Sequence, residues 1–176
     1  MDFVKVCLDA GAAKAAQVLT AQLTFDEIFR TYCEKNYCGR YGKNYTCPPH
    51  VGEIADLIRD IRTRETAVLW QTISPLEDSF DFEGMTRARE KHNDITLKIA
   101  EQARELLGSN VLILGAGGCF LCETCAVNTK EPCRFPGKAI SSLEAYGIDV
   151  SKVETVTDMK YINGANTVTY FSGLFF

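Results

Sequence analysis

The chain has 176 residues, 46% of them hydrophobic, and a formal net charge of −4. This length and composition allow one buried core that needs no structural metal, so we expect a single domain over residues 1–176. The acidic balance argues against a general nucleic-acid-binding protein, because such proteins present a basic surface to phosphates. We therefore predict no nucleic-acid partner.

The sequence also indicates a compartment. The N-terminus has no basic segment followed by a long apolar run, and no stretch approaches the ~18 uninterrupted apolar residues of a membrane helix. We expect a cytoplasmic protein with no membrane partner. Because a reducing cytoplasm keeps thiols free, the eight cysteines are expected to bind metal rather than to form disulfides.

The first predicted elements surround a cysteine-rich loop. Residues 15–23 favour a strand. Thr24 and Glu27 are spaced as a capping box, which predicts a helix over residues 25–35. A loop rich in glycine, tyrosine, asparagine and proline follows, and then the apolar positions of residues 53–61 fall on one helical face.

The second half of the chain alternates strands and helices. Gly108 is placed to end a long charged helix, as a glycine after a helix commonly does. This alternation predicts an α/β fold, a single-domain sandwich with a central sheet flanked by helices and two cysteine-rich metal-binding loops. Strands are expected at residues 66–73, 111–114 and 167–171, and helices at residues 82–107, 138–146 and 151–159.

One cysteine cluster follows the expected strand at residues 111–114. Cys119, Cys122 and Cys125 stand at three-residue steps, and Cys133 follows. A short loop of this kind can wrap one [4Fe–4S] cluster, although the ferredoxin run has a shorter last gap and a proline directly after it. Zinc is the alternative, but structural zinc sites usually pair two cysteine knuckles separated by about a dozen residues.

Two glycines and two basic residues are predicted to support a bound cluster. A dinucleotide loop would need a third glycine at Phe120, so Gly117 and Gly118 are expected instead to bring backbone N–H groups near cluster sulfides. A tight turn without electronic effect is the alternative. Arg40 and Lys43 are expected to offset the negative charge of a thiolate-bound cluster, unless they are solvated loop charges.

The other cysteine cluster has one thiol too few to close a site. Cys33, Cys38 and Cys47 fall within fifteen residues, and three thiolates leave one iron for a further protein ligand or a small molecule. His50 is the nearest candidate ligand, unless its ring is hydrogen-bonded or solvated. Cys7 is expected to be a small buried apolar residue.

Few other residues suggest acid–base chemistry. His92 lies in the charged helix and is expected to be solvated. Glu123 stands between two predicted ligands and could move protons, with an exposed charge as the alternative. Tyr37, Tyr41 and Tyr45 are expected to pack over the three-cysteine site and limit solvent access.

Several stretches together resemble a family of bacterial and archaeal proteins described as predicted metal-binding proteins. The resemblance extends over nearly the whole chain, and it implies metal binding without naming a substrate. It is carried by CGRYGKNY at residues 38–45 with CPP at 47–49, GGC at 117–119, EPCRFP at 131–136 and SLEAYGIDV at 142–150.

Three hypotheses about function follow. The first is an iron–sulfur protein, suited to an anaerobic or reducing cytoplasm, that relays low-potential electrons to a redox partner protein. The second is an enzyme whose three-cysteine site keeps an iron open for a small-molecule substrate while the four-cysteine cluster supplies electrons. The third is a zinc-binding structural or interaction module without redox activity. A homo-oligomer is compatible with each.

Overall fold

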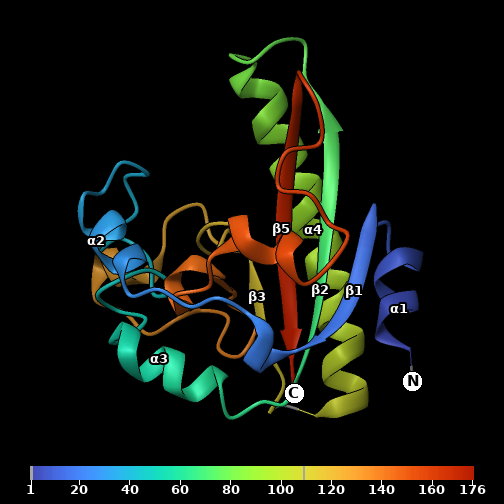
Figure 1. The fold of residues 1–176 in the computed structure, drawn as a ribbon. Coiled ribbons are helices and arrows are strands. Elements are labelled where there is room, and N and C mark those ends of the chain that lie inside the picture. Colours follow the sequence, from blue (N-terminus) through green and yellow to red (C-terminus); the bar gives the residue numbers. More distant parts are fainter. Residues whose placement is uncertain (1, 109) are drawn as a thin grey trace.

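The computed structural model describes residues 2–108 and 110–176. Within them, five strands form one mixed sheet in the order β1-β2-β5-β3-β4 (Figure 1). The pairs β1–β2, β2–β5 and β5–β3 are antiparallel, and β3–β4 is parallel. The strands are β1 (Lys14–Leu19), β2 (Thr66–Pro75), β3 (Leu112–Gly115), β4 (Ser141–Ser142) and β5 (Thr167–Phe175).

The central strands are buried on both faces. Ala67 and Leu69 of β2 enter one hydrophobic cluster, whereas Val68 and Trp70 enter the other. Successive side chains of a strand point to opposite faces, so a continuous apolar run indicates a sheet that is covered on both sides.

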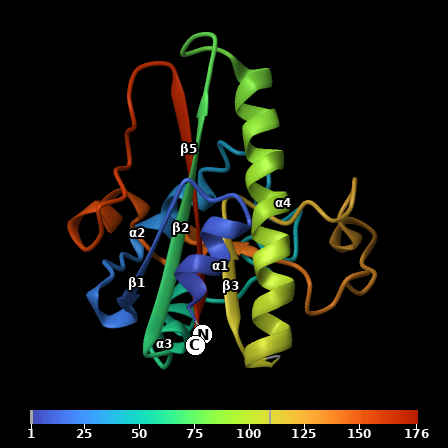
Figure 2. The ribbon, with the colours of Figure 1, turned by 90° about the vertical axis from the view of Figure 1, so that its right-hand side faces the viewer.

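Helices α1 (Phe3–Asp9) and α4 (Phe82–Leu107) cover one face of the sheet (Figure 2). The long helix α4 begins where the side chain of Asp81 accepts a hydrogen bond from the Gly84 N–H at 2.7 Å. It ends at Gly108, whose φ of +81° lies in the region that glycine adopts without strain. A stripe along α4 packs on the sheet, namely Ala88, His92, Ile95, Ile99 and Ala103.

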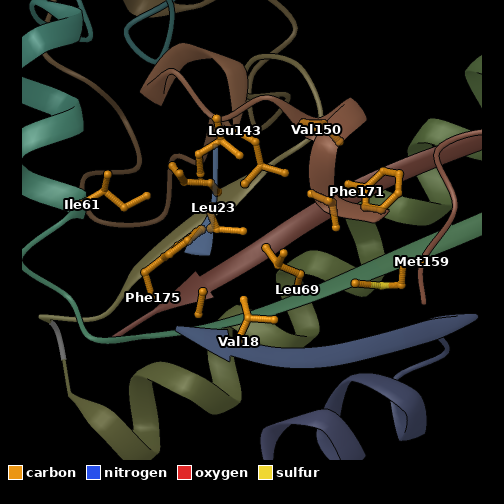
Figure 3. Close-up of a cluster of buried hydrophobic side chains, with 13 residues drawn as sticks. Val18, Leu23, Ile61, Leu69, Leu143, Val150, Met159, Phe171 and Phe175 are labelled. Carbon is orange, nitrogen blue, oxygen red and sulfur yellow. The ribbon is translucent and has the colours of Figure 1, made fainter. Parts of the chain in front are cut away.

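The other face is covered by short elements and loops. Helix α3 (Ile54–Ile61) contributes Ile61, and the segment before β5 contributes Leu143, Val150 and Met159 to a core around Leu69 (Figure 3). The remaining elements are helix α2 (Ile28–Glu34) and the 3-10 turns η1 (Thr20–Gln22), η2 (Ala126–Thr129), η3 (Glu144–Tyr146) and η4 (Val150–Thr155).

The predicted α/β class and the long helix are confirmed, and several local predictions are wrong. The strand predicted at residues 15–23 ends at Leu19, because η1 follows it. The predicted capping box does not form, since Glu27 makes no side-chain cap bond and Asp26 accepts the N–H of Ile28 instead.

The two short helices predicted before the last strand are also absent from the described chain. Within residues 138–146, strand β4 pairs with β3 and only the 3-10 turn η3 follows. The segment 151–159 holds the 3-10 turn η4 in place of an α-helix. Sheet pairing and packing override the local helical pattern here. Helix α1 was not predicted.

The prediction of a solvated His92 is wrong. The ring is fully buried between α4 and the sheet, with Nδ1 2.9 Å from the Thr72 hydroxyl and Nε2 2.7 Å from the Ser172 hydroxyl. The Ser172 hydroxyl also lies 3.0 Å from that of Thr96. Burial lowers the pKa of His92 from 6.5 to about 4, so the ring is neutral at pH 7.

No helix in the described ranges is both long and apolar enough to cross a bilayer. The longest, α4, carries charged residues along its exposed face.

The buried histidine predicts a pH dependence of stability. Between pH 6.5 and about 4, the unfolded chain binds a proton at His92 that the folded chain does not bind. The contribution of the neutral ring to the free energy of unfolding is therefore complete above pH 6.5 and is lost as the pH falls. In urea unfolding, His92→Gln should lower the free energy of unfolding at pH 7 by about 1–3 kcal/mol, through a lost hydrogen bond. The wild type should lose free energy of unfolding between pH 7 and pH 5, and His92→Gln should make that loss smaller by about 2 kcal/mol.

The exposed His50 provides the matched control. His50→Gln should keep the wild-type pH dependence. An unchanged slope in His92→Gln would show that the buried ring does not control this part of the stability.

Candidate metal centre

The two cysteine-rich segments lie against each other, although they are far apart in the sequence. The Asn44 side-chain amide donates to the Cys119 carbonyl at 2.9 Å, and the Cys119 N–H donates to the Thr46 hydroxyl at 2.9 Å. Both main-chain groups of Cys119 are therefore held by side chains of the first loop. Figure 1 shows α2 and the segment after β3 on the same side of the molecule.

This junction is buried and well satisfied. Asn44 and Thr46 are only 5% and 6% exposed, and Oδ1 of Asn44 accepts both the N–H and the hydroxyl of Thr46. A buried polar group that loses its partner costs about 1–3 kcal/mol, so the network holds one arrangement of the loops. Two bonds extend the contact, from the Tyr45 hydroxyl to the Glu131 carbonyl at 2.7 Å and from the Asn128 amide to the Lys43 carbonyl at 3.0 Å.

The four-cysteine segment begins and ends at neighbouring strands. It leaves β3 at Gly115 and returns in β4, where Ser142 pairs with Gly115. The sheet therefore fixes both ends of the segment, and Arg134 ties its middle by donating to the Thr124 carbonyl at 3.0 Å. One small cavity, between this segment and residues 44–46, is lined by four cysteines, namely Cys119, Cys122, Cys125 and Cys133.

The first three cysteines also form a group. Burial, with smaller contributions from the thiols of Cys38 and Cys33, raises the pKa of Cys47 to about 11, although Arg40 opposes this rise. Burial, followed by Cys38, raises the pKa of Cys33 as well. Thiols that shift one another's pKa in this way are close in space, so the fold gathers residues from α2 and from the following loop.

Helix α2 is positioned by the segment that follows β4. The Asp26 N–H donates to the Gly147 carbonyl at 2.7 Å, and the Asp149 N–H donates to the Thr24 carbonyl at 2.9 Å. Arg30 of α2 also donates to the Gly52 carbonyl at 2.6 Å. This bond fixes the end of the loop that carries Cys38 and Cys47. Cys33 is thereby held relative to Cys47.

The raised thiol pKa values have a chemical consequence. Burial raises the pKa of Cys119 too, with a smaller contribution from Cys122 and Cys133. These thiols are protonated at pH 7 in the metal-free chain. Because cysteine binds metal as the thiolate, metal uptake by these residues would release protons.

Gly118 brings the two groups into contact. A Cβ at position 118 would lie 2.9 Å from Sγ of Cys47 and 3.4 Å from Cδ of Arg40. That separation is shorter than a carbon–sulfur contact allows, so only glycine fits without moving the thiol. The predicted hydrogen bonds from Gly117 and Gly118 to cluster sulfides stay a prediction.

The glycine contact gives a test of the site. Gly118→Ala should displace Cys47 and lower the metal bound per chain, with the larger loss at the three-cysteine group. Metal content by elemental analysis and thermal unfolding measure the two effects separately.

Gly115→Ala is the control for this test, because the atoms nearest to a Cβ there belong to Ile140, at 3.2 Å, and to Ser172 and Thr96, and none to a cysteine. It should keep the wild-type metal content. Equal metal loss in both variants would mean that general disruption of the segment after β3, and not contact with Cys47, is responsible.

The other candidate residues take different places. His50 is exposed and its Nε2 lies 3.2 Å from the Gly42 carbonyl, so the hydrogen-bonded alternative is observed. Lys43 is exposed, and its contact to the second segment is made by its carbonyl. Glu123 is exposed. Cys7 is fully buried in the core beside α4, as expected.

The tyrosines divide into two kinds. Tyr45 is half-buried at the junction of the two segments, and Tyr41 is half-buried as well. The expectation that Tyr37 packs over the site is wrong, because its side chain is 88% exposed.

Sequence reasoning missed several residues of this region. Asn44 and Thr46 gave no signal, because a polar residue in a loop is usually solvated. Glu144 was also missed, although it stands in the family-like SLEAYGIDV stretch. Burial raises the pKa of this carboxyl, and its charge raises the pKa of Cys33, which places it near the three-cysteine group.

Over residues 2–108 and 110–176, no three histidine, cysteine, aspartate or glutamate side chains are close enough to hold one metal ion. Cysteine thiolates are ligands of zinc and of iron–sulfur clusters alike.

A comparison with family models identifies the chain. Residues 16–176 match the family described as Predicted metal-binding protein (DUF2284). The chain belongs to this family. Its description agrees with the two thiol groups and names no metal. No curated protein and no solved structure matches the chain.

Proposed function

We propose that this member of the metal-binding family is an iron–sulfur protein with two [4Fe–4S] clusters that acts in low-potential electron transfer or reductive chemistry. Cys119, Cys122, Cys125 and Cys133 would close one cluster. Cys33, Cys38 and Cys47 would hold the other and leave one iron without a thiolate. A [4Fe–4S] cluster passes single electrons, and its potential depends on burial and on hydrogen bonds around the sulfurs.

The junction between the two thiol groups is the observation that carries this proposal. The main chain of Cys119 is bonded to Asn44 and Thr46, and Cys47 packs against Gly118. Two separate structural zinc sites would not need such contact. Two redox centres would, because electrons pass only between centres that are close.

The charges around the junction support the same proposal. Arg40 is half-buried beside Cys47 and lowers the pKa of that thiol, which favours the thiolate. A buried anionic cluster needs such a cation. The partner would be a redox protein, or a small-molecule substrate that reaches the iron left open by the three cysteines.

Metal analysis tests the proposal directly. After anaerobic purification, the chain should carry about eight iron atoms and about eight acid-labile sulfides, with an electron paramagnetic resonance signal after dithionite reduction. Stoichiometric zinc without sulfide would refute the proposal and leave the zinc module.

Cysteine variants separate the two centres. Replacing Cys33, Cys38 and Cys47 together by serine should remove about half of the iron, because the other four thiols remain. Cys7→Ala removes a cysteine that lies in the core and should keep all of the iron. Complete loss of iron in the triple variant would show that the seven cysteines do not form two independent sites.

The open iron is tested by adding cyanide to the reduced protein. The resonance spectrum of the wild type should change, because a vacant iron position binds an added ligand. The triple cysteine variant should give no change. An unchanged wild-type spectrum would favour an electron carrier over an enzyme.

A further inference from the structure

A second cavity lies beside the candidate metal centre. It has a volume of about 440 Å³ and lies between α4 and the segment 115–123 that follows β3. Arg40 of the first cysteine-rich loop also lines the cavity, and so do Cys119 and Cys122. A cavity of this size suits a small molecule.

Two arginines line this cavity, together with Lys138. The guanidinium carbons of Arg40 and Arg89 lie 4.5 Å and 4.9 Å from the centre of the Phe120 ring. Both side chains are half-buried. Stacking on one aromatic ring holds two like charges in the same small space, and this costs free energy unless an anion offsets the repulsion.

No carboxylate of the described residues forms an ion pair with either arginine. Within residues 2–108 and 110–176, the guanidinium groups of Arg40 and Arg89 form no ion pair and no hydrogen bond, and Nε of Arg89 is buried without a partner. Arg87, two positions away on α4, pairs with Glu83 at 3.7 Å. The acidic residues that line the cavity are exposed and lie on α4 and in the cysteine-rich segment, namely Glu90, Asp94 and Glu123.

We propose that this cavity binds a small molecule through an oxyanion group, a carboxylate or a phosphate, held between Arg40 and Arg89. Guanidinium groups bind both oxyanions through paired N–H donors, and such charge-assisted bonds are strong where water is excluded. The rest of the molecule would lie against Leu97, Leu121 and Ile140.

The position of the cavity gives the bound molecule a role. Its wall includes Cys119 and Cys122, and Arg40 also neighbours Cys47, so the oxyanion would lie next to both thiol groups. A role as substrate rests on the proposed function. Anion binding itself does not, because Arg89 makes no ion pair with the described residues whichever metal the thiols hold.

Calorimetric titration of the anaerobically purified, metal-loaded protein tests this inference. The probes are inorganic phosphate and benzoate, which joins a carboxylate to an apolar ring. At least one should bind saturably, and raising the salt concentration should weaken the binding. Benzoate alone would assign a carboxylate ligand, and phosphate alone would assign a phosphate ligand.

Variants of α4 locate the binding. Arg89→Gln should lower the affinity for the probe by about tenfold or more. Arg89→Lys should lower the affinity by less, because lysine keeps the charge and loses only the paired donors. Arg87→Gln is the matched control on the same helix and should bind as the wild type does. Circular dichroism checks that each variant is folded.

The inference is overturned if neither probe saturates below about 10 mM, or if Arg89→Gln binds as tightly as the wild type. Iron and sulfide are counted in the same samples. Probe binding in a protein that holds zinc would contradict the proposed function and leave the anion site standing. A full iron content without probe binding would support the proposed function and overturn the anion site.

Discussion

The arrangement of this protein depends on one buried junction, in which Asn44 and Thr46 hold both main-chain groups of Cys119. The residues are more than 70 positions apart, and each cysteine-rich segment alone is too irregular to fix its own shape. Because the junction is buried and its bonds are satisfied, the two segments keep one register. Cys47 then meets the backbone at Gly118, and two groups of thiols become neighbours.

The sheet supplies the rigid support for this junction. Strands β3 and β4 hold the two ends of the four-cysteine segment, and α4 packs across the sheet behind it. The segment around Gly147 and Asp149 fixes the start of α2, which carries Cys33. Irregular loops can place ligands accurately only when their ends are fixed in this way.

Two polar side chains on α4, the buried His92 and the half-buried Arg89, differ in how their nitrogens are satisfied. His92 has both ring nitrogens near hydroxyl groups and stays neutral, so its network is complete. Arg89 keeps its charge, and its Nε has no partner among the described residues. A complete network stabilises the fold, whereas an incomplete one beside a cavity indicates a ligand.

The sequence alone determined the features that depend on local spacing. The step between Cys119, Cys122 and Cys125 is a local pattern, and so is the apolar stripe that predicted helix 82–107. The tertiary structure decided what depends on distant pairing. Ser141–Ser142 form strand β4 beside β3, Asn44 reaches Cys119, and Arg40 meets Arg89 over Phe120. Such contacts arise from the packing of segments far apart in the chain, which no local periodicity records.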